Sequence, residues 1–177
     1  MKAVALTCAR CSGRLLAAPG VALGVCNPCS TAWDFSTGEK REVPVLEAVN
    51  RKQAGEKVMR LPFVRFEAEG SGRSAPVFVM VFGIAKIGTP FDDGSKLTVD
   101  AKEIETRPGC VDAPPELSLE TAAALARFLA LRVLDREGKS SLRPQAVHLR
   151  NPAVVAVPFR VVGATLVDPI SGMTIMS

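Results

Sequence analysis

Four of the five cysteines are arranged in two pairs whose spacing is typical of a metal site. The pairs are Cys8 with Cys11 and Cys26 with Cys29; two residues lie within each pair, and 14 residues separate the pairs. Each pair forms a tight turn that directs two sulfurs at one point, and two such turns complete a tetrahedron. We therefore predict that these four thiolates hold one structural Zn²⁺ ion. Such a site is closed, with no coordination position left for a reacting water.

Two other readings of the same cysteines are open at this point. In the first, the cysteines are unliganded or form two disulfides, although paired cysteines in a reducing compartment are more often metal ligands. Iron in a rubredoxin-like site is the second, because the same ligand set serves both metals. The polar neighbours Arg10, Arg14 and Asn27 favour zinc, since an electron-transfer site usually benefits from an apolar shell.

The residues around the pairs predict the elements that position the sulfurs. Two short strands are expected between Leu15 and Val25, joined by a turn at Pro19 and Gly20. Another begins at Trp33. Gly13 is expected to supply backbone freedom for the first turn, and Pro28 fixes a backbone angle in the second. This is a zinc-ribbon arrangement over residues 1–42, with so small a core that the metal contributes its folding energy.

The motif resembles known zinc ribbons. The pattern is Leu6-x-Cys8-x-x-Cys11-x-Gly13-x-Leu15 followed by Cys26-x-x-Cys29-x-x-x-Trp33-x-Phe35. It is similar to the rubredoxin-type zinc ribbon with its four-cysteine knuckles. With Val43-Pro44-Val45-Leu46, it also resembles the zinc-ribbon scaffold that activates several methyltransferases by binding them. That similarity ends near residue 46, so the partner enzymes are not implied here.

The whole chain also resembles a group of uncharacterised bacterial zinc-ribbon proteins. The resemblance depends on a strand in the second part, which here is Leu61-Pro62-Phe63-Val64-Arg65-Phe66. It implies a two-part chain and no particular activity.

Residues 43–177 predict an α+β domain with a mostly antiparallel β-sheet. Strands are expected from Val58 to Glu69 and from Pro76 to Phe82, joined by a glycine turn, with the second strand central because it is apolar throughout. Pro62 suggests an edge or a bulge in the first strand. The last third returns to strands, the longest from Ala153 to Val162.

One long apolar helix is expected from Leu119 to Asp135. Ser118 is a good N-cap, and no Gly or Pro interrupts the segment. Apolar residues cover more than half of its circumference. We therefore expect the helix to be buried by the sheet on one side and by a further partner on another.

Composition limits the compartment and the class of protein. The chain has 177 residues, of which 47% are hydrophobic. Its longest apolar run, from Ala75 to Ala85, holds 11 residues, whereas a spanning helix needs about 20. The N-terminus has only a short apolar run, which does not fit a signal peptide. These features predict a cytoplasmic protein without a transmembrane segment.

Few residues outside the cysteine pairs have the character of a catalytic group. His148 is the only histidine and lies in a strand-like segment, so an ordinary surface or core role is expected. Cys110 has no nearby histidine to activate it and is expected to be a bystander. Asp92-Asp93-Gly94 is typical of a solvated turn. Nucleotide-binding glycine motifs are absent from the sequence. No catalytic or cofactor-binding residue is predicted, and we expect no enzymatic activity.

The charge balance favours a protein partner over a nucleic acid. The 22 basic residues exceed the 18 acidic ones by four and are scattered. Over residues 1–42, five basic and three acidic residues, with two negative charges from a zinc tetrathiolate, sum to zero. Phosphate contacts dominate non-specific nucleic-acid affinity, and a neutral module offers few of them.

The function expected from the sequence is therefore a non-enzymatic scaffold or binding subunit. It would act through contacts with a protein partner or with further copies of itself, inside a larger assembly. A nucleic-acid-binding or transcription-related regulator is the alternative. A rubredoxin-like iron electron carrier is the further alternative.

Overall fold

Strands account for 47% of the residues that the structure describes, and they are organised around one sheet. The computed structural model describes residues 6–49, 57–82, 97–98, 104–134, 142–168, 170, 172 and 174–176. Asp92, Asp93 and Gly94 lie outside these ranges. Within the described residues, no helix combines the length and apolar character that crossing a membrane requires.

The elements follow in the order β1 (Leu23–Cys26), η1 (Asn27–Cys29), β2 (Thr31–Asp34), β3 (Arg41–Ala48), β4 (Val58–Gly70), β5 (Arg73–Met80), β6 (Thr106–Pro108), α2 (Leu119–Leu134), η2 (Pro144–Ala146), β7 (His148–Val162), β8 (Thr165–Val167) and β9 (Thr174–Met176). The sheet order is β1-β2-β3-β7-β4-β5; β6 adds to β3, and β8 and β9 continue from β7. Among the described pairings, only that of β3 with β7 is parallel.

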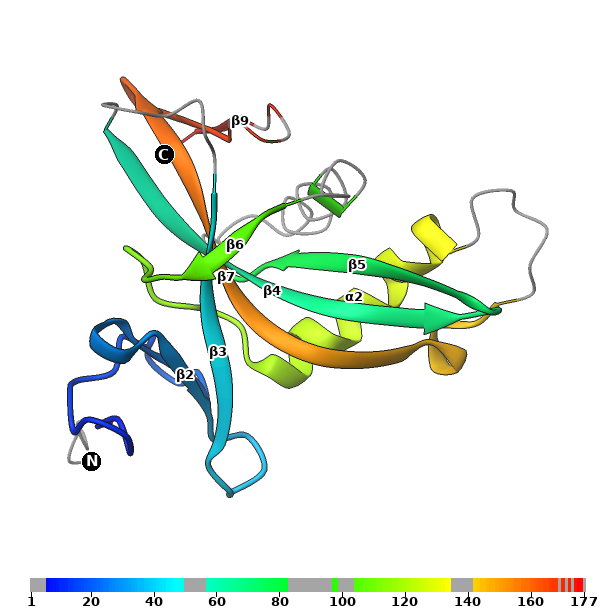
Figure 1. Cartoon of the computed structure of the whole chain (residues 1–177), viewed down its shortest axis with the longest axis horizontal. Helices are drawn as coiled ribbons and strands as arrows, with labels where there is room; N and C mark the ends of the chain where they lie inside the picture. Colours follow the sequence, from blue (N-terminus) through cyan, green and yellow to red (C-terminus); the bar gives the residue numbers. More distant parts are fainter. Residues whose placement is uncertain are drawn as a thin grey trace.

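The long strands β4 and β7 form the centre of the sheet. They lie side by side in Figure 1 and run from the β8–β9 hairpin to the far end of the sheet. A two-residue turn joins β4 to β5, and both of its residues, Ser71 and Gly72, have positive φ. Two consecutive positive φ angles match the right-handed twist of a hairpin, which explains the tight connection predicted from the glycines.

Two expectations about these strands were wrong. Among the described strands, β5 is the last in the sheet order, not central; its residues from Ala75 onward are apolar because both faces of the sheet are covered there. Pro62 lies in an inner strand, and the register shift in β4 falls later, between Arg65 and Glu67. The Pro62 carbonyl accepts a hydrogen bond from the Val81 N–H at 3.3 Å. In an antiparallel pair, the N–H and the carbonyl of one residue point toward the same neighbouring strand. The N–H that Pro62 lacks would therefore point toward β5, which has already ended at this position.

The helix α2 begins as predicted but is buried on one side only. The Ser118 Oγ accepts the Thr121 N–H at 3.1 Å and caps the first turn. Its buried positions face the sheet (Figure 1) and are Leu119, Ala122, Ala126, Leu129, Ala130 and Leu134. Over the other side, where Phe128 is 54% exposed, the described residues place no element beyond the short turn η2. The helix is therefore amphipathic, with small alanines against the sheet.

The two faces of the sheet carry separate cores. Phe63, Phe82 and Phe159 pack together on one face, with ring centroids 5.6 to 6.3 Å apart. The other face packs against α2. The core between this face and α2 continues into the ribbon. Its buried members there are Leu23, Val25, Ala32, Val43 and Val45.

The strand β3 joins the ribbon to the rest of the sheet. Its first half, Arg41 to Pro44, pairs with β2, and its second half pairs with β6 and β7. The division predicted after residue 42 therefore falls within one continuous strand.

Candidate metal centre

The structure brings the four predicted ligands together at the N-terminal end of the chain. The Sγ atoms of Cys8 and Cys29 lie 3.6 Å apart, those of Cys11 and Cys26 lie 3.3 Å apart, and all four fall within 4.8 Å of one another. A tetrahedral ion with metal–sulfur bonds of about 2.3 Å needs sulfurs about 3.8 Å apart. A disulfide needs about 2.05 Å, and these cysteines are free. The donor set and its spacing therefore fit a metal ion such as zinc.

Each cysteine pair is held by a turn that ends in a left-handed residue. Ser12 follows the first pair with φ +59°, and Ser30 follows the second with φ +51°. In the first turn the Ser12 N–H donates to the Cys8 carbonyl at 2.9 Å. The Cys8 N–H donates to the Gly13 carbonyl at 2.8 Å, which closes the loop around the sulfurs.

Gly13 serves the site in a different way from the one predicted. Its φ is not positive, so the backbone freedom expected of it is used by Ser12 instead. A Cβ at Gly13 would lie 3.2 Å from the Cys11 Sγ and 3.6 Å from the Cys26 Sγ. The missing side chain therefore leaves room for the sulfurs.

Hydrogen bonds favour the thiolate at one ligand in particular. Burial alone would raise the pKa of Cys8, but backbone N–H groups at Cys11 and Arg10 and the Trp33 indole outweigh burial and lower that pKa to about 6. The Trp33 Nε1 donates to the Cys8 Sγ at 3.3 Å, and the indole is itself buried. Burial raises the pKa values of Cys26 and Cys29. A bound cation would oppose that rise, because it stabilises thiolates.

The second turn is docked on a segment distant in sequence. The Asn27 Nδ2 donates to the Val111 carbonyl at 2.8 Å, and the Asn27 Oδ1 accepts the Val111 N–H at 3.0 Å. The side chain thus pairs with both polar groups of one buried backbone unit. The sequence analysis did not predict this contact. The only signal was the amide side chain of Asn27 between the ligands Cys26 and Cys29, and an amide does not indicate which residue it will pair with.

The segment that receives Asn27 is itself fixed to the sheet. The Asp112 Oδ2 accepts the Arg60 N–H at 2.7 Å, and the Asp112 N–H donates to the Arg60 carbonyl at 2.8 Å. The Arg60 guanidinium donates to the Glu47 carboxylate at 3.1 Å, which raises the pKa of Arg60. A Cβ at Gly109 would lie 2.4 Å from the Glu47 Cβ, so only glycine fits there. The turn that carries Cys26 and Cys29 therefore rests on a segment that is hydrogen-bonded to β4.

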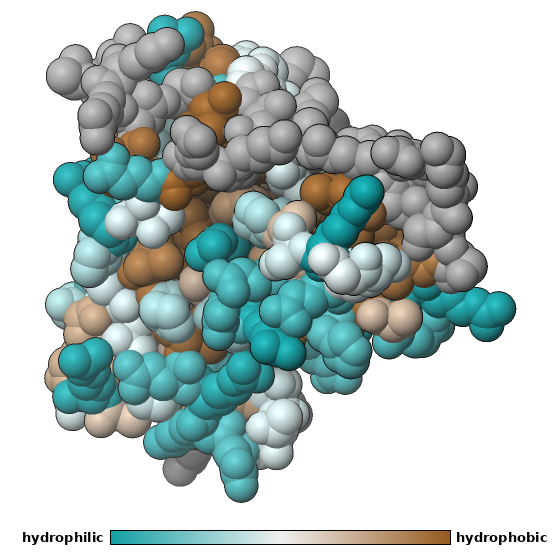
Figure 2. Space-filling view, turned by 45° about the vertical axis from the view of Figure 1, so that its right-hand side comes forward, coloured by the Kyte–Doolittle hydropathy of each residue, from teal (hydrophilic) through white to brown (hydrophobic). Residues whose placement is uncertain are grey.

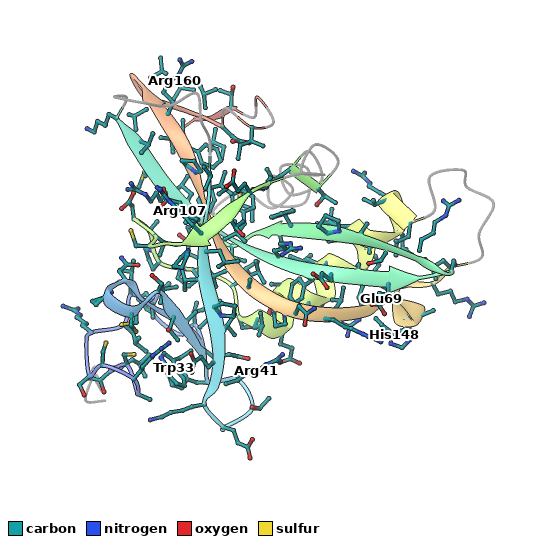
Figure 3. The ribbon with its side chains drawn as sticks, viewed as in Figure 1. Trp33, Arg41, Glu69, Arg107, His148 and Arg160 are labelled. Atoms are coloured by element: carbon teal, nitrogen blue, oxygen red, sulfur yellow. The ribbon has the colours of Figure 1, made fainter. Side chains whose placement is uncertain are left out.

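Of the other residues singled out by sequence, neither His148 nor Cys110 belongs to the four-sulfur cluster. His148 and Glu69 pair in register at the opposite end of the sheet from Trp33 (Figure 3), and His148 is exposed. Cys110 is partly buried and precedes Val111, the residue that holds Asn27.

Comparisons with known proteins add no assignment. The chain matches no protein-family model, no curated protein and no solved structure.

Proposed function

We propose that the chain is a non-enzymatic zinc-ribbon scaffold, or binding subunit, that acts through protein–protein contacts in a larger assembly. The observation that carries this proposal is the set of four sulfurs within 4.8 Å of one another. A complete set of four thiolate ligands leaves a tetrahedral ion no open position for substrate, which is the pattern of a structural site.

In this proposal Cys8, Cys11, Cys26 and Cys29 hold one zinc ion, which links the two turns and lowers the free energy of the folded ribbon. Zinc is preferred to iron because the surroundings are polar on one side. Arg10 and Cys11 are exposed, and Asn27 hydrogen-bonds beside the second pair. A rubredoxin-like electron carrier remains an outcome of the metal analysis below.

A binding role follows from what the fixed ribbon can present. Because β3 and Asn27 anchor it at two places, the ribbon offers a preformed surface that loses little entropy on association. Apolar residues reach the surface beside hydrophilic ones on the face in Figure 2. A non-obligate protein interface has a similar mixture, since it is about as apolar as the rest of a protein surface.

Charges on the ribbon support a protein partner over nucleic acid. The Arg10 guanidinium lies 3.5 Å from the Glu42 carboxylate, so one of the ribbon's few cations is already paired. Phosphate binding depends on several unpaired cations acting together.

Native and denaturing mass spectrometry of the chain purified from its own host tests the proposal. After nuclease treatment and a high-salt wash, we expect one zinc ion and a second protein at fixed stoichiometry. In a parallel preparation without those two steps, salt-sensitive retention of nucleic acid would overturn the proposal in favour of a nucleic-acid-binding regulator. A red iron-containing preparation would overturn it in favour of an electron carrier. Cys26→Ser should lose the metal, and Cys110→Ser, which removes a thiol outside the cluster, is the matched control.

A further inference from the structure

The four cysteines of the metal centre differ in how far solvent reaches them. Cys8 is 2% exposed and Cys26 is 0% exposed, Cys29 is partly buried, and Cys11 is exposed. The residues on either side of Cys11 in the chain are exposed as well. A reagent in solution therefore reaches Cys11 more readily than it reaches Cys8 or Cys26.

The exposed sulfur has a buried sulfur as its neighbour. The Cys11 Sγ lies 3.3 Å from the Cys26 Sγ, so the two atoms need to approach by only about 1.3 Å to reach the length of a disulfide bond. A Cβ at Gly13 would contact both atoms, at 3.2 and 3.6 Å. Because glycine has no Cβ, this residue places no side chain beside the two sulfurs.

The sulfur of Cys8 is protected by hydrogen bonds as well as by burial. The Cys8 Sγ accepts the Arg10 N–H at 3.4 Å and the Trp33 Nε1–H at 3.3 Å. Hydrogen bonds that stabilise a thiolate also reduce its nucleophilicity. Within the first pair, both exposure and hydrogen bonding therefore direct an oxidant to Cys11.

We propose that Cys11 is the oxidation site of the metal centre, at which a peroxide converts Cys11 and Cys26 to a disulfide and so displaces the metal. This rests on the proposed function, in which the four sulfurs hold zinc, and it adds a means of regulating that site. The chemical class of the reagent is a small peroxide, because only a small molecule in solution has to reach one exposed sulfur.

Two successive displacements account for the atoms and electrons. The Cys11 thiolate attacks one oxygen of hydrogen peroxide, the O–O bond breaks, and a sulfenic acid and hydroxide form. The Cys26 thiolate then attacks the Cys11 sulfur, the S–S bond forms, and a second hydroxide leaves. The two sulfurs lose two electrons in total, and the peroxide is reduced to two waters once two protons are taken up. Two of the four donors are consumed, and the two remaining thiolates hold zinc much more weakly.

The burial of Cys26 makes it the residue that resolves the oxidised Cys11. It is within reach of the Cys11 sulfur but not of a thiol in solution. The new bond joins residues 15 apart, one from each turn, and so replaces the link that the metal provided. Asn27 still pairs with Val111. Oxidation therefore empties the centre without releasing the ribbon from the sheet.

Peroxide treatment of the zinc-loaded full chain, carrying Cys110→Ser so that only the four ligand thiols remain, tests the proposal. Zinc content is measured first, and zinc release to a chromogenic chelator is followed after hydrogen peroxide is added. The remaining thiols are then blocked with N-ethylmaleimide, and non-reduced tryptic peptides are analysed by mass spectrometry. Cleavage after Arg10 places Cys8 and Cys11 in different peptides, and fragmentation distinguishes Cys26 from Cys29.

We expect one Cys11–Cys26 disulfide for each zinc ion released, and a dithiol reductant should restore both thiols and zinc binding. Limiting iodoacetamide should label Cys11 about tenfold faster than Cys8 or Cys26, because modification follows exposure. The chain that retains Cys110 is the matched control and should release zinc at the same rate.

A first disulfide within one cysteine pair, or oxidation that leaves zinc bound, would overturn the proposal and leave the zinc site intact. Faster zinc release in the chain that retains Cys110 would also overturn it, because that thiol would then take part. A chain that holds no zinc before peroxide is added would overturn the proposed function, and this inference with it. The initial zinc measurement therefore separates the two kinds of failure.

Discussion

Replacing Asn27 with alanine should destabilise the folded chain, although this residue is not a metal ligand. The substitution removes two hydrogen bonds, of 2.8 and 3.0 Å, to the backbone of Val111. Val111 is 1% exposed, so its N–H and carbonyl are left buried without these partners. Each unsatisfied group costs about 1–3 kcal/mol, and partial entry of water lowers the upper limit. We expect a loss of about 2–4 kcal/mol, a large fraction of a typical domain's stability.

Urea unfolding with excess zinc measures this loss, and the slope of the transition shows whether the change in midpoint reflects stability alone. Arg10→Ala is the control. It alters the corresponding turn of the first pair, but the ion pair it removes joins side chains that are 63% and 53% exposed. Exposed pairs contribute about 0–1 kcal/mol. A loss in Asn27→Ala no greater than that in Arg10→Ala would refute the idea that this side chain fastens the ribbon to the sheet.

Three further results are expected. Gly13→Ala should speed the transfer of zinc to a chromogenic chelator, because its methyl group would lie 3.2 Å from a ligand sulfur; an unchanged rate would contradict this. Gly109→Ala should lower stability by at least about 2 kcal/mol in thermal unfolding, because the new Cβ meets the backbone of β3 at 2.8 Å. Cys26→Ser should abolish stoichiometric zinc in elemental analysis while Cys110→Ser retains it, and equal loss in both would remove the four-sulfur assignment.

Local features of the fold were accessible from sequence because they depend on short spacings. The two cysteine pairs, the cap at Ser118 and the glycine turn between β4 and β5 each require only a few adjacent residues. Their geometry is fixed by chain connectivity, so a single sequence is sufficient to identify them.

Contacts between distant segments could not be predicted in the same way. The pairing of Asn27 with Val111 and the parallel register of β3 with β7 join residues far apart in the chain. Neither depends on a distinctive residue type. The helix shows the same limit, because periodicity identified its apolar positions but not which of them the sheet covers.

Because β3 runs without a break from the ribbon into the rest of the sheet, metal binding at the ribbon would affect the stability of the whole sheet. Unfolding of the ribbon breaks the pairing of β2 with β3. Because β3 also pairs with β6 and β7, unfolding of the ribbon disturbs those pairings as well. A ligand that binds only the folded state stabilises every element that unfolds with its site, by an amount that grows with its free concentration. With zinc bound, the free zinc level would therefore help to set how often distant segments open, including the helix that covers the far end of the sheet.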